Sequence, residues 1–126
     1  MNVFKLFLLC LGLHFFSDFT LQGLLAQLKC SEWWEKNYPQ ELYKRDWICG
    51  LWEHSIYWTL VTFAPVIYLW NMPMWGLGLL LVGNIINHAW VDDKKANKRE
   101  ISLCQDQLCH LVQIVGTVLV FAVCRS

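Results

Sequence analysis

The chain has 126 residues, which is enough for one domain and too few for two separate cores. Hydrophobic residues make up 56% of it and charged residues 16%, a composition that favours a membrane protein over a soluble one. Its formal net charge is zero, so nothing in the charge indicates nucleic-acid binding.

The first predicted element is an apolar segment over residues 2–28, which His14, Asp18 and Gln22 interrupt. A charged start followed by an apolar stretch would also fit a cleaved signal peptide. However, no A-x-A-like cleavage site follows, and a histidine and an aspartate break the run. We therefore expect a retained transmembrane helix here.

Residues 29–50 are polar and aromatic, and Pro39 divides them. Amphipathic rings are favoured at the headgroup level of a bilayer, so we expect short interfacial helices on either side of Pro39. The aromatic residues that support this prediction are Trp33, Trp34, Tyr38, Tyr43 and Trp47.

Three more spans are predicted after this segment. The second covers residues 51–70, with His54 near its start, and a tight turn at Asn71-Met-Pro73 separates it from a third span over 74–91. The third is close to the roughly 20 residues that a bilayer requires. A charged link over 92–100 leads to a fourth span, which begins near Ser102 as N-cap and runs to Cys124. The predicted fold is all-α: a single membrane domain over 1–126, forming a four-helix transmembrane bundle with an interfacial, Trp-rich loop between its first two helices.

The distribution of lysine and arginine predicts the orientation. The first and third links carry most of these residues, whereas the opposite side has only Lys5 and Arg125. The positive-inside rule therefore places both links in the cytoplasm and both termini outside. The basic residues of the two links are Lys29, Lys36, Lys44, Arg45, Lys94, Lys95, Lys98 and Arg99. The last four also suit anionic lipid headgroups.

Three of the predicted helices carry a histidine and an aspartate four residues apart. Residues at this spacing lie on one face of a helix, roughly 6 Å from each other. With the predicted topology, all three pairs lie toward the cytoplasmic side, with the histidines in a deeper layer than the aspartates. The pairs are His14 with Asp18, His88 with Asp92, and His110 with Asp106.

Such a layer of polar groups indicates a metal site. A charged side chain at the centre of a spanning helix costs about 2.5–3.5 kcal/mol, so these groups require partners or a wet cavity. One His–Asp pair alone is more often a structural hydrogen bond, but three pairs in one layer favour a metal. Imidazole and carboxylate suit zinc, with manganese or iron as alternatives, and one or two ions could bind. The candidate metal ligands are His14, Asp18, His88, Asp92, Asp106 and His110, with His54 as a further ligand or acid–base group.

Other polar residues extend the same helix faces. Gln22 and Asn84 continue them by another turn and could bind substrate or metal-bound water, and Lys95 lies where it could meet a phosphate. Asn87 and Gln107 point off these faces, and we interpret them as helix–helix hydrogen bonds. We interpret the glycines of the third span as positions that permit close packing.

The same motifs resemble a known family. They are H-x3-D-F-x-L-Q, at His14 to Gln22; H-x3-D-x2-K, at His88 to Lys95; and D-Q-x2-H, at Asp106 to His110. In this combination the chain resembles a family of small phage and bacterial integral membrane proteins of unknown function. The likeness covers nearly the whole chain and implies the same fold and site. We expect a multi-pass protein of a bacterial inner membrane, in which the positive-inside rule makes both termini periplasmic. The Trp-rich residues 31–46 and the surroundings of His54 are less typical of it. The chain is also loosely similar to inner-membrane metal-dependent hydrolases.

The leading functional hypothesis is a metal-dependent hydrolase that acts on a phosphoester, either a lipid headgroup or a nucleotide. Candidate catalytic residues are His54, Asp106 and Lys95, and candidate substrate-binding residues are Gln22, Lys95 and Asn84. One alternative is a cation- or proton-handling membrane protein, in which an oligomer could line a path. Another is a phage accessory protein that binds a host partner and has a purely structural metal.

Overall fold

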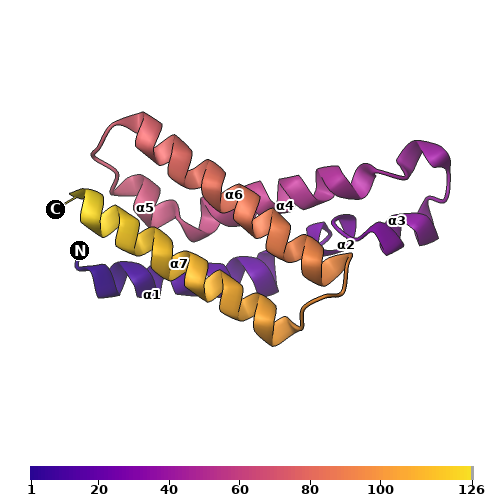
Figure 1. The fold of residues 1–126 in the computed structure, drawn as a ribbon, viewed down its shortest axis with the longest axis horizontal. Coiled ribbons are helices and arrows are strands. Elements are labelled where there is room, and N and C mark those ends of the chain that lie inside the picture. The colour runs from indigo at the N-terminus through magenta and orange to yellow at the C-terminus, as the bar shows by residue number, and fades with distance from the viewer. Residues whose placement is uncertain (126) are drawn as a thin grey trace.

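The computed structural model describes residues 1–125, and they form helices with no strand in that range (Figure 1). The long helices are α1 (Val3–Phe16), α4 (Asp46–Thr62), α6 (Met74–Ala96) and α7 (Leu103–Arg125). The short ones are the π-helix η1 (Ser17–Leu21), α2 (Leu25–Leu28), α3 (Ser31–Asn37), the 3-10 helix η2 (Glu41–Tyr43) and α5 (Ala64–Tyr68). The all-helical part of the prediction is confirmed.

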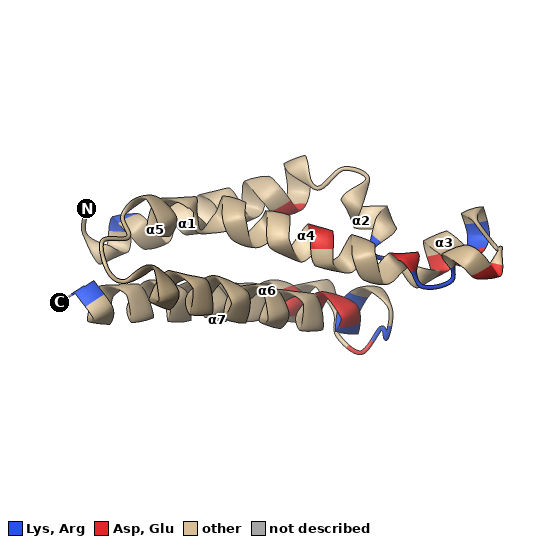
Figure 2. Ribbon diagram, turned by 90° about the horizontal axis from the view of Figure 1, so that it is seen from above, with Lys and Arg blue, Asp and Glu red and all other residues tan. Residues whose placement is uncertain are grey.

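The four long helices pack in a closed ring, in which α1 contacts α4 and α7, and α6 contacts α4 and α7. Seen from above, α1, α4 and α5 lie in one layer and α6 and α7 in the other (Figure 2). The two termini lie together at one end, whereas α3 lies at the opposite end, beyond the bundle (Figure 1).

Three segments are long and apolar enough to cross a membrane: Val3–Leu21, Met74–Ala96 and Leu103–Arg125. Their outer surfaces are strongly apolar, with Phe4, Leu79 and Val112 each about two-thirds exposed (66%, 67% and 65%). Exposed apolar faces of this extent are typical of helices that contact lipid rather than water. These segments correspond to the first, third and fourth predicted spans.

The predicted second span is not one continuous helix. The chain instead forms α4, which starts earlier than expected at Asp46, and the short α5, with a break at Phe63. Pro65 explains the break, because proline has no N–H to donate and its ring clashes with the carbonyl four residues earlier. At 17 residues, α4 is shorter than the segments that could cross a membrane.

The first span also ends earlier than predicted. After α1 the backbone widens into η1, and the helix stops at Leu21. Gly23 then adopts a positive φ of 46°, a conformation that glycine takes without the steric cost other residues incur, and the chain turns into α2. The predicted apolar helix over 2–28 is therefore two helical segments joined by a turn.

The other boundaries agree better with prediction. α6 starts directly after Pro73 but continues past Val91 to Ala96, so Asp92 lies inside the helix rather than in a link. Ser102 caps α7 as predicted: its hydroxyl accepts from the Gln105 N–H at 3.3 Å, and the Gln105 side chain accepts from the Ser102 N–H at 2.8 Å. This reciprocal pair is a capping box. The predicted interfacial helices on either side of Pro39 are α3 and the short η2.

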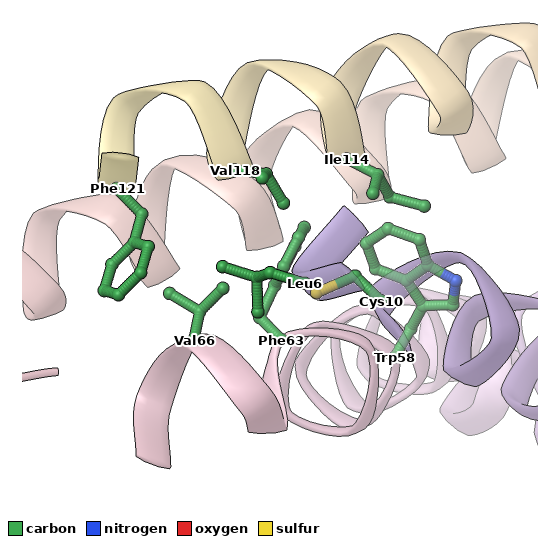
Figure 3. Packing of buried hydrophobic residues seen from close by; sticks show 8 residues of the cluster. All are labelled: Leu6, Cys10, Trp58, Phe63, Val66, Ile114, Val118 and Phe121. Carbon is green, nitrogen blue, oxygen red and sulfur yellow. The ribbon is translucent and has the colours of Figure 1, made fainter. Parts of the chain in front are cut away.

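The apolar core occupies the half of the bundle nearer the termini (Figure 3). It joins α1, α4, α5 and α7, and the ring of Trp58 is fully buried within it. On its other edge, Trp58 stacks on His88 with ring centroids 4.0 Å apart, so this tryptophan marks the boundary between the core and a polar layer. The core residues are Leu6, Cys10, Trp58, Phe63, Val66, Ile114, Val118 and Phe121.

Candidate metal centre

Each of the four long helices brings one histidine to the same buried layer. His14, His54, His88 and His110 are each at most 1% exposed, and three aspartates accompany them. Asp92 and Asp106 lie one helical turn from their histidines on α6 and α7, so helix geometry alone places each pair on one face. Asp18 enters from η1, the π-helical turn that follows α1. The fold brings the three pairs together in one layer, as their spacing predicts.

Asp92 lies at the middle of the cluster. Its Oδ2 atom is 2.6 Å from the Lys29 ammonium, 3.1 Å from His54 Nε2 and 3.5 Å from His88 Nε2. Its other oxygen lies 3.6 Å from His110 Nε2. Three imidazoles from three helices therefore direct the same ring nitrogen at one carboxylate.

Ordinary hydrogen bonds do not satisfy all of these atoms. His54 Nε2 lies 3.2 Å from His88 Nε2 and 3.2 Å from Lys29 Nζ, in addition to its contact with Asp92. An imidazole nitrogen either donates one proton or accepts one, so it cannot donate to the carboxylate and also accept from Lys29. His54 Nε2 therefore cannot form hydrogen bonds with Asp92, His88 and Lys29 at the same time.

A second set of unpaired atoms lies beside it on α7. His110 Nε2 and Asp106 Oδ1 are 3.3 Å apart, yet both are buried without a hydrogen-bond partner among the described residues. Unpaired polar atoms in a protein interior are rare, because each loses its hydration without compensation. A nitrogen and a carboxylate oxygen that are close together and unpaired suit ligation of a common cation.

The distances match a metal site. Two ligand atoms on one tetrahedral zinc ion lie about 3.4 Å apart, because zinc–nitrogen bonds are about 2.1 Å long. The separations among the His54, His88 and Asp92 atoms, 3.1–3.5 Å, fall close to this value. Three groups of buried residues have ligand atoms near enough to hold an ion: Asp18 with His54 and His88, His88 with Asp92 and His110, and Asp18 with Asp106 and His110.

The charges of the cluster do not balance without a further cation. Three buried carboxylates, Asp18, Asp92 and Asp106, face two ammonium groups, those of Lys29 and Lys95. With neutral imidazoles, one negative charge is left in a layer from which water is largely excluded. An uncompensated buried charge is costly, so the layer requires a bound cation or a further proton on one of its imidazoles or carboxylates.

His14 differs from the other three histidines. The Trp58 indole N–H donates to His14 Nδ1 at 3.0 Å, and the His14 Nε2 atom lies 3.0 Å from the Gln107 side-chain oxygen. Since indole only donates, Nδ1 must be the acceptor and Nε2 must carry the proton. Both ring nitrogens already form hydrogen bonds, so this predicted ligand is not available to a metal. His14 instead orients Gln107 at the edge of the cluster.

Gln107 joins α7 to α1 at the centre of the layer. Besides accepting from His14, its amide donates to Asp18 Oδ2 at 3.0 Å and to Asp106 Oδ2 at 3.1 Å. The expected helix–helix hydrogen bond is confirmed, but the residue does more than join helices. It fixes the orientation of two candidate ligands, as the outer partners of metal sites commonly do.

Lys29 reaches the cluster from outside the long helices. It follows α2, and its side chain is buried against Asp92 and His54. Asn97 holds this loop in place: its amide donates to the Lys29 carbonyl at 3.2 Å, and its oxygen accepts from the Ser31 N–H at 2.8 Å. Gly50 on α4 lets α2 approach, because a Cβ there would overlap the Leu28 backbone.

The remaining predicted site residues lie at the margin of the cluster. Lys95 pairs with Asp106 at 2.8 Å and is about one-third exposed. Gln22 donates to the Asp18 backbone carbonyl and does not contact the clustered side chains through any described hydrogen bond. Asn84 lies further along α6, where its oxygen accepts from Gln113 at 2.8 Å and from Thr117 at 3.0 Å.

Sequence reasoning missed three residues of this site: Lys29, interpreted only as a topology signal; Trp58, not expected there; and Gln107, placed off the main face. The sequence does signal Gln107, because it follows Asp106 and faces the neighbouring helix. No local pattern signals Lys29, whose position depends on the path of a loop. Burial raises the pKa of the thiol of its neighbour Cys30.

Comparisons with protein-family models, curated proteins and solved structures find no match to this chain. The function is therefore inferred from the geometry of the cluster.

Proposed function

We propose that this protein is an integral membrane protein whose buried layer binds a divalent metal ion, with His54, His88, Asp92 and His110 as ligands. The observation that carries the proposal is the crowding of ligand atoms around Asp92 and His110. The Nε2 atoms of His54 and His88 both lie within 3.5 Å of one Asp92 oxygen, and His110 Nε2 and Asp106 Oδ1 lie 3.3 Å apart with no hydrogen bond to any described residue. One ion would satisfy atoms that hydrogen bonds leave unpaired.

Zinc suits this donor set best, since imidazole nitrogen and carboxylate oxygen are its common ligands after thiolate, and manganese or iron are the alternatives. The group of Asp18, Asp106 and His110 offers room for a second ion beside the first. In either case Gln107 orients Asp18 and Asp106, and His14 orients Gln107. The described residues thus supply ligands and the groups that position them.

The activity we propose is hydrolysis of a phosphoester. A bound divalent ion would lower the pKa of a coordinated water to about 7 and polarise the scissile group. Asp106 is outside the four proposed ligands, with its Oδ1 atom beside His110 and its Oδ2 atom paired with Lys95, so it is placed to take a proton from an attacking water. Lys95 is the partly exposed cation at this edge, and an anionic substrate would compete with Asp106 for it.

The proposed location is a bacterial inner membrane, with both termini in the periplasm and the α6–α7 link in the cytoplasm. Basic residues support this orientation, because most of them lie around α3 and that link, at the end remote from the termini (Figure 2). Substrate would then reach the layer from the cytoplasmic side, where Lys95 lies.

The test is turnover of a panel of phosphomonoesters and phosphodiesters by detergent-purified protein with zinc, manganese or iron(II). Hydrolysis should require metal and fall at least about 100-fold in His88→Ala and Asp92→Asn, because loss of a mere outer partner of a metal ligand already costs about 10–100-fold. Lys98→Met is the matched control, since Lys98 is half-exposed and pairs with Asp93, outside the cluster. Metal binding without turnover of any phosphoester would refute the hydrolase and leave the metal site standing.

A second candidate function, movement of cations or protons, is favoured by one specific observation. The Lys29 ammonium already lies 2.6 Å from Asp92 and 3.2 Å from His54. A cationic side chain in contact with carboxylate and imidazole is the arrangement of proton relays in membranes. Proton flux into liposomes that does not depend on metal and is lost in Lys29→Met would favour this function over hydrolysis.

A further inference from the structure

The outer face of the bundle carries a groove between α6 and α7, the two helices that form one layer in Figure 2. Its volume is about 290 Å³, and small and amide side chains line it together with the apolar residues Leu79, Leu80 and Val120. The residues that give it this character are Gly83, Asn84, Asn87, Gln113, Gly116 and Thr117.

The two glycines leave the groove open. A Cβ added at Gly83 or at Gly116 would meet nothing within 4 Å, so neither glycine is needed for packing inside one chain. In membranes, small residues on a helix surface let another helix approach closely, and packing rather than hydrophobicity drives the association. Here one glycine lies on each wall of the groove.

The groove also contains amide groups that one chain leaves unpaired. Asn87 is exposed on α6, a helix long and apolar enough to cross a membrane, and has no hydrogen-bond partner among the described residues. Gln113 on the facing wall is only 7% exposed, and its side-chain oxygen is buried without a donor from the described part of the chain. Hydrocarbon offers the exposed Asn87 amide no partner, so a polar contact from outside would stabilise it.

We propose that a second copy of this chain docks in the groove, forming a twofold dimer through α6 and α7. An amide side chain is both donor and acceptor, so two Asn87 residues related by a twofold axis satisfy each other. The groove-lining residues carry no charge, so a charged partner would find no counter-charge there. A self-complementary neutral face fits an identical copy.

This dimer does not depend on the metal proposal, because Asn87 and the two glycines are not candidate ligands. The experiment measures energy transfer between donor- and acceptor-labelled copies of the full chain in liposomes, over a range of protein-to-lipid ratios. Asn87→Leu and Gly83→Ile should each weaken association at least about tenfold, since one removes the amide pair and the other fills the groove. Asn87→Gln should retain association.

Gly78→Ile is the matched control, because Gly78 lies on the same helix, meets nothing within 4 Å and does not line the groove. Gly116→Ile tests the other wall if Gly83→Ile fails to fold, which circular dichroism would detect. Transfer no higher than random collision for the wild type at every ratio would overturn the dimer. Association that survives Asn87→Leu and both glycine variants would overturn this interface.

Discussion

Replacing Lys29 with methionine separates a metal site from a purely ionic network. The Lys29 ammonium lies 2.6 Å from Asp92 and is its principal counter-charge, with both residues nearly buried at 8% and 2% exposure. Methionine keeps the length and apolar stem of the side chain but removes its charge. The variant leaves Asp92 ionised in a layer where only imidazoles can compensate it.

The expected loss follows from that burial. Removing one partner of a buried ion pair costs about 3–5 kcal/mol, because the other charge stays desolvated and unpaired. For a chain of this length, such a loss lowers the melting temperature on the order of 10 °C. Bound metal should reverse most of it, since a ligand at 100 times its dissociation constant contributes about 2.7 kcal/mol. The ion would also no longer compete with an ammonium for Asp92.

The assay is thermal unfolding of detergent-purified wild type, Lys29→Met and Lys98→Met, each with a chelator and with zinc. Lys98→Met should change the midpoint little, because exposed ion pairs contribute about 0–1 kcal/mol. We expect zinc to raise the midpoint of Lys29→Met more than that of the wild type. Equal instability of Lys29→Met with and without zinc would refute a metal at Asp92 and favour the ionic network.

Three further variants test how the layer is held. Gly50→Ala should lower the free energy of unfolding by about 1–3 kcal/mol, because the new Cβ overlaps the Leu28 backbone. Gly78→Ala, where a Cβ meets nothing within 4 Å, is the control and should have no such effect. Equal thermal midpoints for the two variants would contradict the close approach of α2 to Gly50. Trp58→Phe should lower the free energy of unfolding by about 1–3 kcal/mol, because it leaves His14 Nδ1 without a donor. A chemical unfolding curve equal to that of the wild type would show that this hydrogen bond is absent. Ser102→Ala should lower the free energy of unfolding by about 1 kcal/mol, because it removes the N-cap of α7. Hydrogen exchange should then show less protection of the amides in the first turn of α7. Unchanged protection would argue against the cap.

The part of the site that is predictable from the sequence depends on helix periodicity alone. Residues four apart share a face whatever the tertiary fold, so the spacing by itself pairs His88 with Asp92 and His110 with Asp106. The apolar runs around them place the pairs in long helices, and the opposite directions of α6 and α7 place them at one level. These inferences need no knowledge of loops.

The parts that failed depend on tertiary contacts or on a single residue inside a run. Pro65 is visible in the sequence, but the prediction of an unbroken second span neglects its effect on a helix. Lys29 could not be placed, because its burial depends on α2 packing at Gly50 and on the hydrogen bonds of Asn97, at the end of α6, with Lys29 and Ser31. Periodicity also does not reveal which ring nitrogen faces a carboxylate, and that detail separates His14 from the other three histidines.

The most direct test of the central claim is the metal content of the purified protein, measured by elemental analysis for the wild type, His88→Ala, Asp92→Asn and the control Lys98→Met. The metal centre predicts at least one zinc, manganese or iron per chain in the wild type and in Lys98→Met, and loss of that ion in the other two variants. A folded wild type that binds no divalent ion when these metals are supplied, or an ion that persists in both His88→Ala and Asp92→Asn, would contradict it.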